Sequence, residues 1–132
     1  MIISFCTVLM IYQKVPAKMI KNKTKNSVLV ENKKILSSVL SRAKGLMFSK
    51  KILDIGYIFK FSKPKKIDLH MFFVFYAIDV LFLDDNKRVI EIKENFKPFT
   101  IYVSKNKASY VIELPQGTIK KSKTKLDDTI SF

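Results

Sequence analysis

Residues 71–83 read MFFVFYAIDVLFL, and Asp79 is the one charged residue in this run. Burying an ionised carboxylate without a partner costs several kcal/mol even after the surroundings relax. The chain must therefore pair Asp79, expose it at a cleft, or raise its pKa until it is neutral. In a strand, residues 79, 81 and 83 share one face and residues 78, 80 and 82 share the other. Both faces are apolar, which predicts an interior strand with Asp79 buried or facing a pocket.

Short β-prone runs separated by turn signals surround this segment. The clearest is a hairpin in which residues 77–83 and 88–93 pair across a turn at residues 84–87. Strands are also predicted at residues 27–30, 34–36, 56–61, 70–73, 101–103, 109–114 and 128–132, and short helices at residues 39–44 and 118–123. Residues 31–33 are predicted as a hairpin turn, and residues 62–68, which include Pro64, as a loop.

This pattern predicts a mostly β (α+β) fold, with a largely antiparallel sheet curled into a small barrel or sandwich and one or two short helices. We expect one domain over residues 26–132. The glycines at positions 45, 56 and 117 are interpreted as positions where the backbone needs the conformational freedom or small size of glycine.

The chain carries a formal net charge of +14, which is typical of proteins that meet polyanions. Of its 25 basic residues, only Arg42 and Arg88 are arginine, the residue preferred for reading bases and clasping phosphates. The lysines are spread along the chain, which favours a solvated surface. Non-specific, salt-sensitive attraction to nucleic acid is expected in either case.

The run MIISFCTVLMIY at residues 1–12 is too short to span a bilayer. We favour a wrongly assigned upstream start codon, with translation in fact beginning at Met10 or Met19, or a poorly packed extension over residues 1–19. One alternative is a weak signal or anchor, but no Lys or Arg precedes the run, as a secretory signal would require. The other alternative is an added strand. The expected location is cytoplasmic; the alternative is export or anchoring through residues 1–19. No stable membrane span is predicted.

Several chemistries have no signal in this sequence. The single cysteine, Cys6, allows no intrachain disulfide, and with the single histidine, His70, it cannot build a Cys/His zinc site. Phosphate-loop, dinucleotide-binding and nucleophile-elbow motifs are absent. We therefore predict no cofactor and no metal, and leave open whether the protein is an enzyme and which residues would be catalytic.

Five segments resemble, in order and spacing, the domain-of-unknown-function 192 family of small uncharacterised bacterial and archaeal proteins. They are SVLSRAKGLM at 38–47, GYIFKF at 56–61, HM at 70–71 with AIDVLFL at 77–83, YVIELPQG at 110–117, and DDTI at 127–130. The resemblance covers about residues 26–132 and implies a compact, largely β fold without an established reaction. This chain has HMFFV at 70–74 where the family typically has Trp-Met-Lys-Asn-Thr, and Asp127-Asp128 where the family usually has Gly-Asp.

The leading functional hypothesis is a pocket that binds a small polar or anionic ligand, or a peptide edge. The candidate ligand-binding residues are Arg42, His70, Met71, Asp79 and Glu113. Arg42 would supply positive charge, Asp79 and Glu113 would orient it, and Met71 with Phe73 would form a wall.

Each candidate also has a structural interpretation. Asp79 would accept backbone N–H groups and fix a turn, Arg42 would bridge to Asp79 or Glu113, and His70 would pack at the rim. Two other function classes stay open. One is a nucleic-acid module that uses the aromatic residues of segment 57–61, and the other is a hydrolase or lyase that uses Asp79 and Glu113 as a carboxylate pair.

Overall fold

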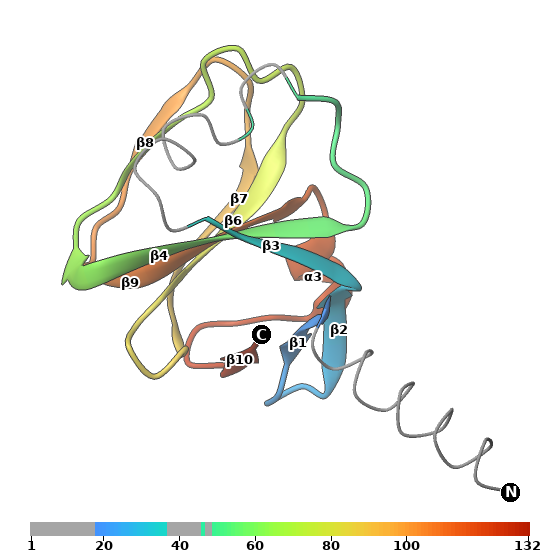
Figure 1. Ribbon diagram of the computed structural model, residues 1–132, viewed down its shortest axis with the longest axis vertical. Helices are drawn as coiled ribbons and strands as arrows, with labels where there is room; N and C mark the ends of the chain where they lie inside the picture. The colour runs from blue at the N-terminus through green and yellow to red at the C-terminus, as the bar shows by residue number, and fades with distance from the viewer. Residues whose placement is uncertain (1–17, 37–45, 47–48) are drawn as a thin grey trace, which may run out of the picture.

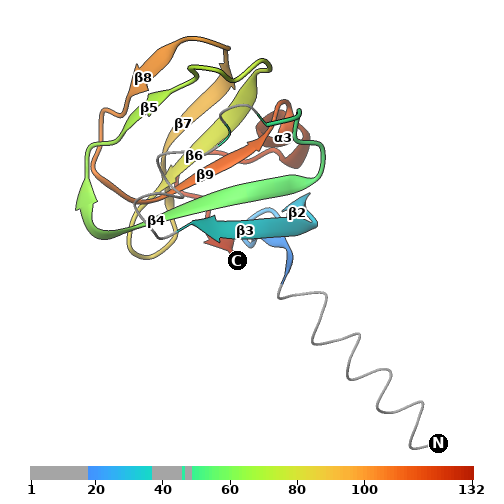
Figure 2. The ribbon, with the colours of Figure 1, turned by 45° about the horizontal axis from the view of Figure 1, so that its top comes forward.

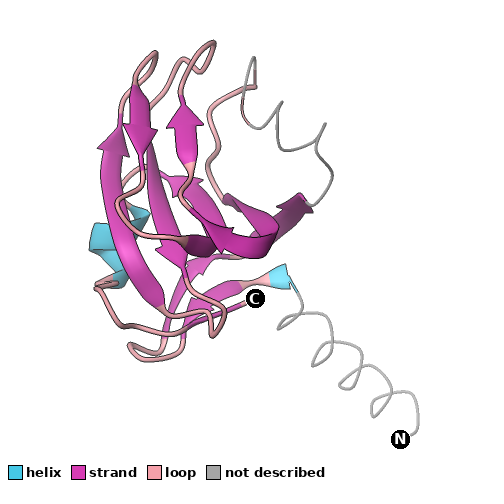
Figure 3. Ribbon diagram, turned by 90° about the vertical axis from the view of Figure 1, so that its left-hand side faces the viewer, coloured by secondary structure: helices cyan, strands magenta, loops and turns pink. Residues whose placement is uncertain are grey.

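The computed structural model describes residues 18–36, 46 and 49–132, and its architecture is mostly β, as predicted. The described strands are β1 (Ile20–Asn22), β2 (Ser27–Val30), β3 (Asn32–Leu36), β4 (Ile55–Lys65), β5 (Asp68–His70), β6 (Ile78–Leu83), β7 (Val89–Phe96), β8 (Ile101–Val103), β9 (Ala108–Pro115) and β10 (Ile130–Ser131). The helix α3 (Thr118–Ser122) lies between β9 and β10 in the chain. Figure 3 shows how strands dominate this part of the chain.

A five-stranded sheet with the order β3-β4-β9-β6-β7 forms the middle layer. Its strands are antiparallel except for the β3–β4 pair, which is parallel. Strand β6 lies between β9 and β7, and all six of its residues are buried. The predicted interior strand and the hairpin that follows it are both confirmed.

Two apolar clusters cover the two faces of this sheet. In Figures 1 and 2 the sheet runs between the β5–β8 ribbon on one side and β1, β2 and β10 on the other. The inner cluster lies under the two-stranded β5–β8 ribbon and contains Val80, Phe82 and Val111 from the sheet. The outer cluster contains Leu81 and Ile112 and packs against α3 and the three-stranded β10-β1-β2 sheet. Alternate residues of β6 therefore enter different cores, which explains why its sequence is apolar throughout.

The predicted hairpin at residues 31–33 is wrong. Strand β2 pairs with β1 in the three-stranded sheet, whereas β3 pairs in parallel with β4. One residue, Glu31, separates the two strands, which is too little for a hairpin loop. The chain continues from one sheet into the next, so Val30 enters the outer cluster and Leu36 the inner one.

The predicted loop at residues 62–68 is also wrong in part, because β4 continues through Pro64 to Lys65. The pairing of β4 with β9 is interrupted between Lys60 and Lys65, so Pro64 lies where no ladder hydrogen bond is required of it. The predicted strand at 70–73 is displaced: β5 ends at His70, and a loop follows. The predicted helix at 39–44, Arg42 and Gly45 lie outside the described residues.

The two residues of the Asp127-Asp128 motif have different structural roles. Asp127 has φ 72°, a left-handed conformation that glycine adopts readily and that aspartate tolerates better than most residues. Asp128 is buried, accepts a 2.8 Å hydrogen bond from Asn22 Nδ2 and forms a 3.1 Å ion pair with Lys25. The left-handed turn at Asp127 therefore places Asp128 against β1.

Gly56 allows β4 to lie close to the outer cluster. A Cβ atom at this position would come within 2.5 Å of Ile20 Cδ1, 3.0 Å of Val30 Cγ2 and 3.2 Å of Leu114 Cδ2. We expect Gly56→Ala to lower the free energy of unfolding by about 1–3 kcal/mol through overpacking, measured by urea denaturation. Ser62→Ala, at an exposed position of the same strand, is the control, and equal stability of both variants would contradict this account.

Candidate functional site

Glu113 is a buried acid on the inner face of the sheet. It lies opposite Tyr57 of β4 and Val80 of β6, so these three residues share the face that carries the inner cluster. The side chain is 8% exposed, and its Oε2 atom has no hydrogen-bond partner among the described residues. Burial raises the pKa of Glu113 to about 8, so the neutral acid is the main form at pH 7.

Tyr76 packs against the same inner cluster, and its hydroxyl group is paired with that of Ser49. The Tyr76 hydroxyl and Ser49 Oγ are 2.6 Å apart, and Ser49 Oγ also donates to the Leu46 carbonyl at 2.7 Å. Burial raises the pKa of Tyr76, and the negative charge of Glu113 adds to this, while the bond to Ser49 opposes it. The inner face thus holds a neutral acid and two hydroxyl groups among apolar side chains.

Asp79 lies on the other face, and its partners are backbone amides. Its Oδ1 atom accepts from the Asn95 N–H at 3.0 Å and its Oδ2 atom from the Ile119 N–H at 3.1 Å. The residue is 2% exposed. Asp79 therefore ties the end of β7 and the first turn of α3 to β6, as the structural interpretation of this residue predicted.

The carboxylate-pair hypothesis is wrong in its geometry. Glu113 pairs with Val80, and Asp79 pairs with Leu114, so the two carboxyl groups point to opposite faces of one sheet. One acid enters the inner cluster, and the other reaches the backbone of α3. They cannot act on the same substrate atom.

The other predicted site residues are separated. Met71 is buried in the inner cluster, and its backbone accepts hydrogen bonds from the Val74 and Phe99 amides. His70 is exposed on β5, where its ring stacks on Phe72 with 5.0 Å between centroids. Arg42 lies outside the described residues. Of the predicted set, the structure thus brings Met71 and Glu113 to the same core.

The aromatic residues considered for nucleic-acid stacking face the protein interior. Phe59 is 6% exposed, and Tyr57 and Phe61 pack partly buried against the same inner cluster. Bases stack on exposed rings, so this segment does not provide a nucleic-acid surface.

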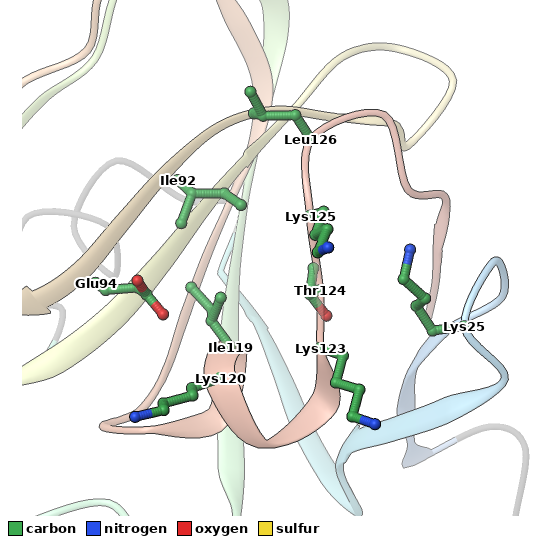
Figure 4. A pocket seen from close by; sticks show the side chains of 9 residues that line it. All are labelled: Lys25, Ile92, Glu94, Ile119, Lys120, Lys123, Thr124, Lys125 and Leu126. Atoms are coloured by element: carbon green, nitrogen blue, oxygen red, sulfur yellow. The ribbon is translucent and has the colours of Figure 1, made fainter.

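A groove of about 680 Å³ lies on the outer side, between α3 and β7. Its lining consists of Lys25, Ile92, Glu94, Ile119, Lys120, Lys123, Thr124, Lys125 and Leu126 (Figure 4). The groove therefore has four positively charged lysines and one negatively charged glutamate around an apolar floor. None of the predicted ligand contacts lines the groove, although Asp79 holds the Ile119 amide beneath it.

Sequence reasoning missed the Tyr76–Ser49 pair, because nothing in the sequence connects two residues 27 positions apart. It also missed Glu91, which accepts from the Tyr102 hydroxyl at 2.6 Å and from the Lys105 and Asn106 amides. Burial opposes ionisation of Glu91, but these hydrogen bonds together lower its pKa. The bond to Glu91, with burial, raises the pKa of Tyr102 to about 12. Nothing in the sequence pointed to Glu91, because the alternation of Ile90 and Ile92 with charged residues placed it on the polar side of the strand.

Together these features define a mostly β domain with a lysine-lined groove on one face of its central sheet. On the other face lies a buried acid, one of whose oxygen atoms has no partner among the residues that the structure describes. The chain belongs to the domain-of-unknown-function 192 family, described as "Uncharacterized ACR", whose model matches residues 20–132. A UPF0127 protein of Pyrococcus horikoshii is 36% identical over 114 residues, covering 86% of this chain and 98% of its own length. A UPF0127 protein of Thermococcus sibiricus is 35% identical over 118 residues, covering 86% and 74%.

Two crystal structures share the fold. A Sinorhizobium meliloti protein, provisionally named a transcription regulator, has a TM-score of 0.76 at 22% identity, covering 86% of this chain and 89% of its own. A Novosphingobium aromaticivorans protein of unknown function has a TM-score of 0.77 at 23% identity, covering 86% and 84%. Within the part of the chain that the structure describes, no helix has the length and apolar character needed to cross a membrane.

Proposed function

We propose that this domain binds a small polar molecule on the inner face of its sheet, with Glu113 as the central contact. The observation that carries this proposal is the buried Oε2 atom of Glu113, which has no hydrogen-bond partner among the described residues. Buried polar atoms are almost always paired, and an unpaired one calls for an explanation such as a missing ligand. Perturbed acids of this kind also gather at functional sites.

The chemistry of the site favours a ligand rich in oxygen atoms. Neutral Glu113 donates one O–H and accepts at its carbonyl oxygen, and the Tyr76 and Ser49 hydroxyl groups add further donors and acceptors. This set matches a hydroxyl, carbonyl or carboxylate group on a small molecule. In this proposal Met71 belongs to the apolar wall, Asp79 positions the backbone, and Arg42 supplies charge to an anionic ligand.

A thermal-shift screen with sugars, polyols and small carboxylic acids tests the proposal. We expect a hit to raise the Tm of the wild type at pH 7 and to lose this effect in Glu113→Leu and in Tyr76→Phe. Glu94→Gln, on the other side of the sheet, serves as the matched control and should keep the shift. A hit that stabilises Glu113→Leu as strongly as the wild type would remove Glu113 from the site.

The lysine-lined groove is a second candidate, for an anion with an apolar body. It is favoured by the four lysines around a floor of Ile92, Ile119 and Leu126. The same screen separates the two candidates, because a groove ligand should lose its Tm shift in Lys120→Ala/Lys123→Ala and keep it in Glu113→Leu. Retention of the shift in the double lysine variant would exclude the groove.

A further inference from the structure

Two neighbouring loops and the β5–β8 ribbon expose a group of large apolar side chains. We name this group the aromatic platform; it consists of Phe72, Phe73, Phe75, Phe99, Ile101 and Val103. Phe75 is 64% exposed and Ile101 62% exposed. Soluble domains rarely expose so many large apolar side chains together, and such patches mark interaction sites.

The geometry holds the platform together at one end of the fold. Phe99 makes edge-to-face contacts with Phe75 at 5.4 Å and with Phe73 at 6.2 Å between ring centroids. The Met71 N–H donates to the Thr100 carbonyl, and the Phe99 N–H donates to the Met71 carbonyl, so the two loops are joined through their backbones. The β5–β8 ribbon lies at the end of the structure away from β1, β2 and β10 (Figures 1 and 2).

The segments that carry the platform are rich in exposed lysines. The segments that carry it, residues 62–76 and 97–107, contain one acidic residue, Asp68, against six lysines. These are Lys63, Lys65, Lys66, Lys97, Lys105 and Lys107, all of them exposed. The β5–β8 ribbon pairs Asp68 with Val103 at one end and His70 with Ile101 at the other. Most of these lysines therefore adjoin the Asp68–Val103 end, and the phenylalanines adjoin the His70–Ile101 end.

We propose that the aromatic platform docks on a membrane surface that contains anionic lipids. Phenylalanine and aliphatic side chains insert at the boundary between headgroups and acyl chains, and lysines beside them attract acidic headgroups. A partner protein is less well matched, because β5 and β8 are three residues long and offer little edge for an added strand.

Vesicle co-sedimentation with the full chain tests the proposal. The probes are phosphatidylcholine vesicles, alone and with phosphatidylserine as about a third of the lipid, at near-physiological salt. We expect binding to the mixed vesicles. Phe75→Ser/Phe99→Ser should weaken it at least about tenfold, because apolar insertion is lost. Ile35→Ser/Leu53→Ser is the control, since both side chains are exposed and belong to other segments.

A second pair of variants separates docking at this face from general attraction of a cation. Lys97→Ala/Lys105→Ala should weaken binding about fivefold for each lysine, and Lys120→Ala/Lys121→Ala on α3 should weaken it less. Unchanged Tm values would show that the variants fold. Vesicle binding that survives Phe75→Ser/Phe99→Ser, no binding of the wild type, or self-association of the wild type that these substitutions abolish would each overturn the proposal.

Discussion

Replacement of Asp79 by alanine is expected to lower the free energy of unfolding by about 3 kcal/mol or more. Both carboxylate oxygens accept backbone N–H groups, from Asn95 and Ile119, in a site that is almost fully buried. Removing the acceptor leaves two donors without partners, and each buried unsatisfied group costs about 1–3 kcal/mol. Urea denaturation at pH 7 measures the loss.

Asp79→Asn and Asp68→Ala complete this experiment. Asparagine keeps one carbonyl acceptor but turns an N–H₂ group toward one of the two donors, so we expect an intermediate loss. Asp68 is exposed on β5, and its replacement should change stability by less than about 0.5 kcal/mol. If Asp79→Ala were as stable as Asp68→Ala, Asp79 would not hold α3 and β7 in place.

The apolar run around Asp79 predicted its strand well because each residue of β6 had to enter a core. Alternation in β7 and the turn at residues 84–87 predicted the hairpin from local signals alone. Pairing between distant strands has no such local signal. The parallel β3–β4 pair and the separation of β2 from β3 depend on which core each strand enters, and the sequence between them does not encode that choice.

The candidate site, like the fold, was predicted only in its local features. Asp79 and Glu113 were recognised as acids among apolar residues, and both are buried. Which face each acid occupies depends on the register of β6 against β9, and a shift of one residue would exchange the faces. The Tyr76–Ser49 pair depends on how a loop folds back onto the sheet. Residue types therefore predicted burial, whereas register and loop geometry decide what the acids contact.

Glu113 is expected to make the protein less stable as the pH rises from about 5 to 8. Its pKa is raised to about 8 in the folded state, whereas an unfolded glutamate titrates near 4.3. Between these values the folded chain holds a proton that the unfolded chain has released, so rising pH favours unfolding. The loss reaches up to about 1.4 kcal/mol per pH unit, or about 5 kcal/mol across the whole window.

Glu113→Gln isolates this effect, because glutamine has nearly the shape of the protonated acid and does not titrate. We expect the variant to match the wild type near pH 5 and to exceed its stability at pH 8, measured by urea denaturation at a series of pH values. Subtracting the two profiles cancels the contributions of Glu91 and Asp128, which both proteins share. Parallel profiles would mean that Glu113 is ionised and paired in the folded protein, and the proposed ligand site would lose its central contact.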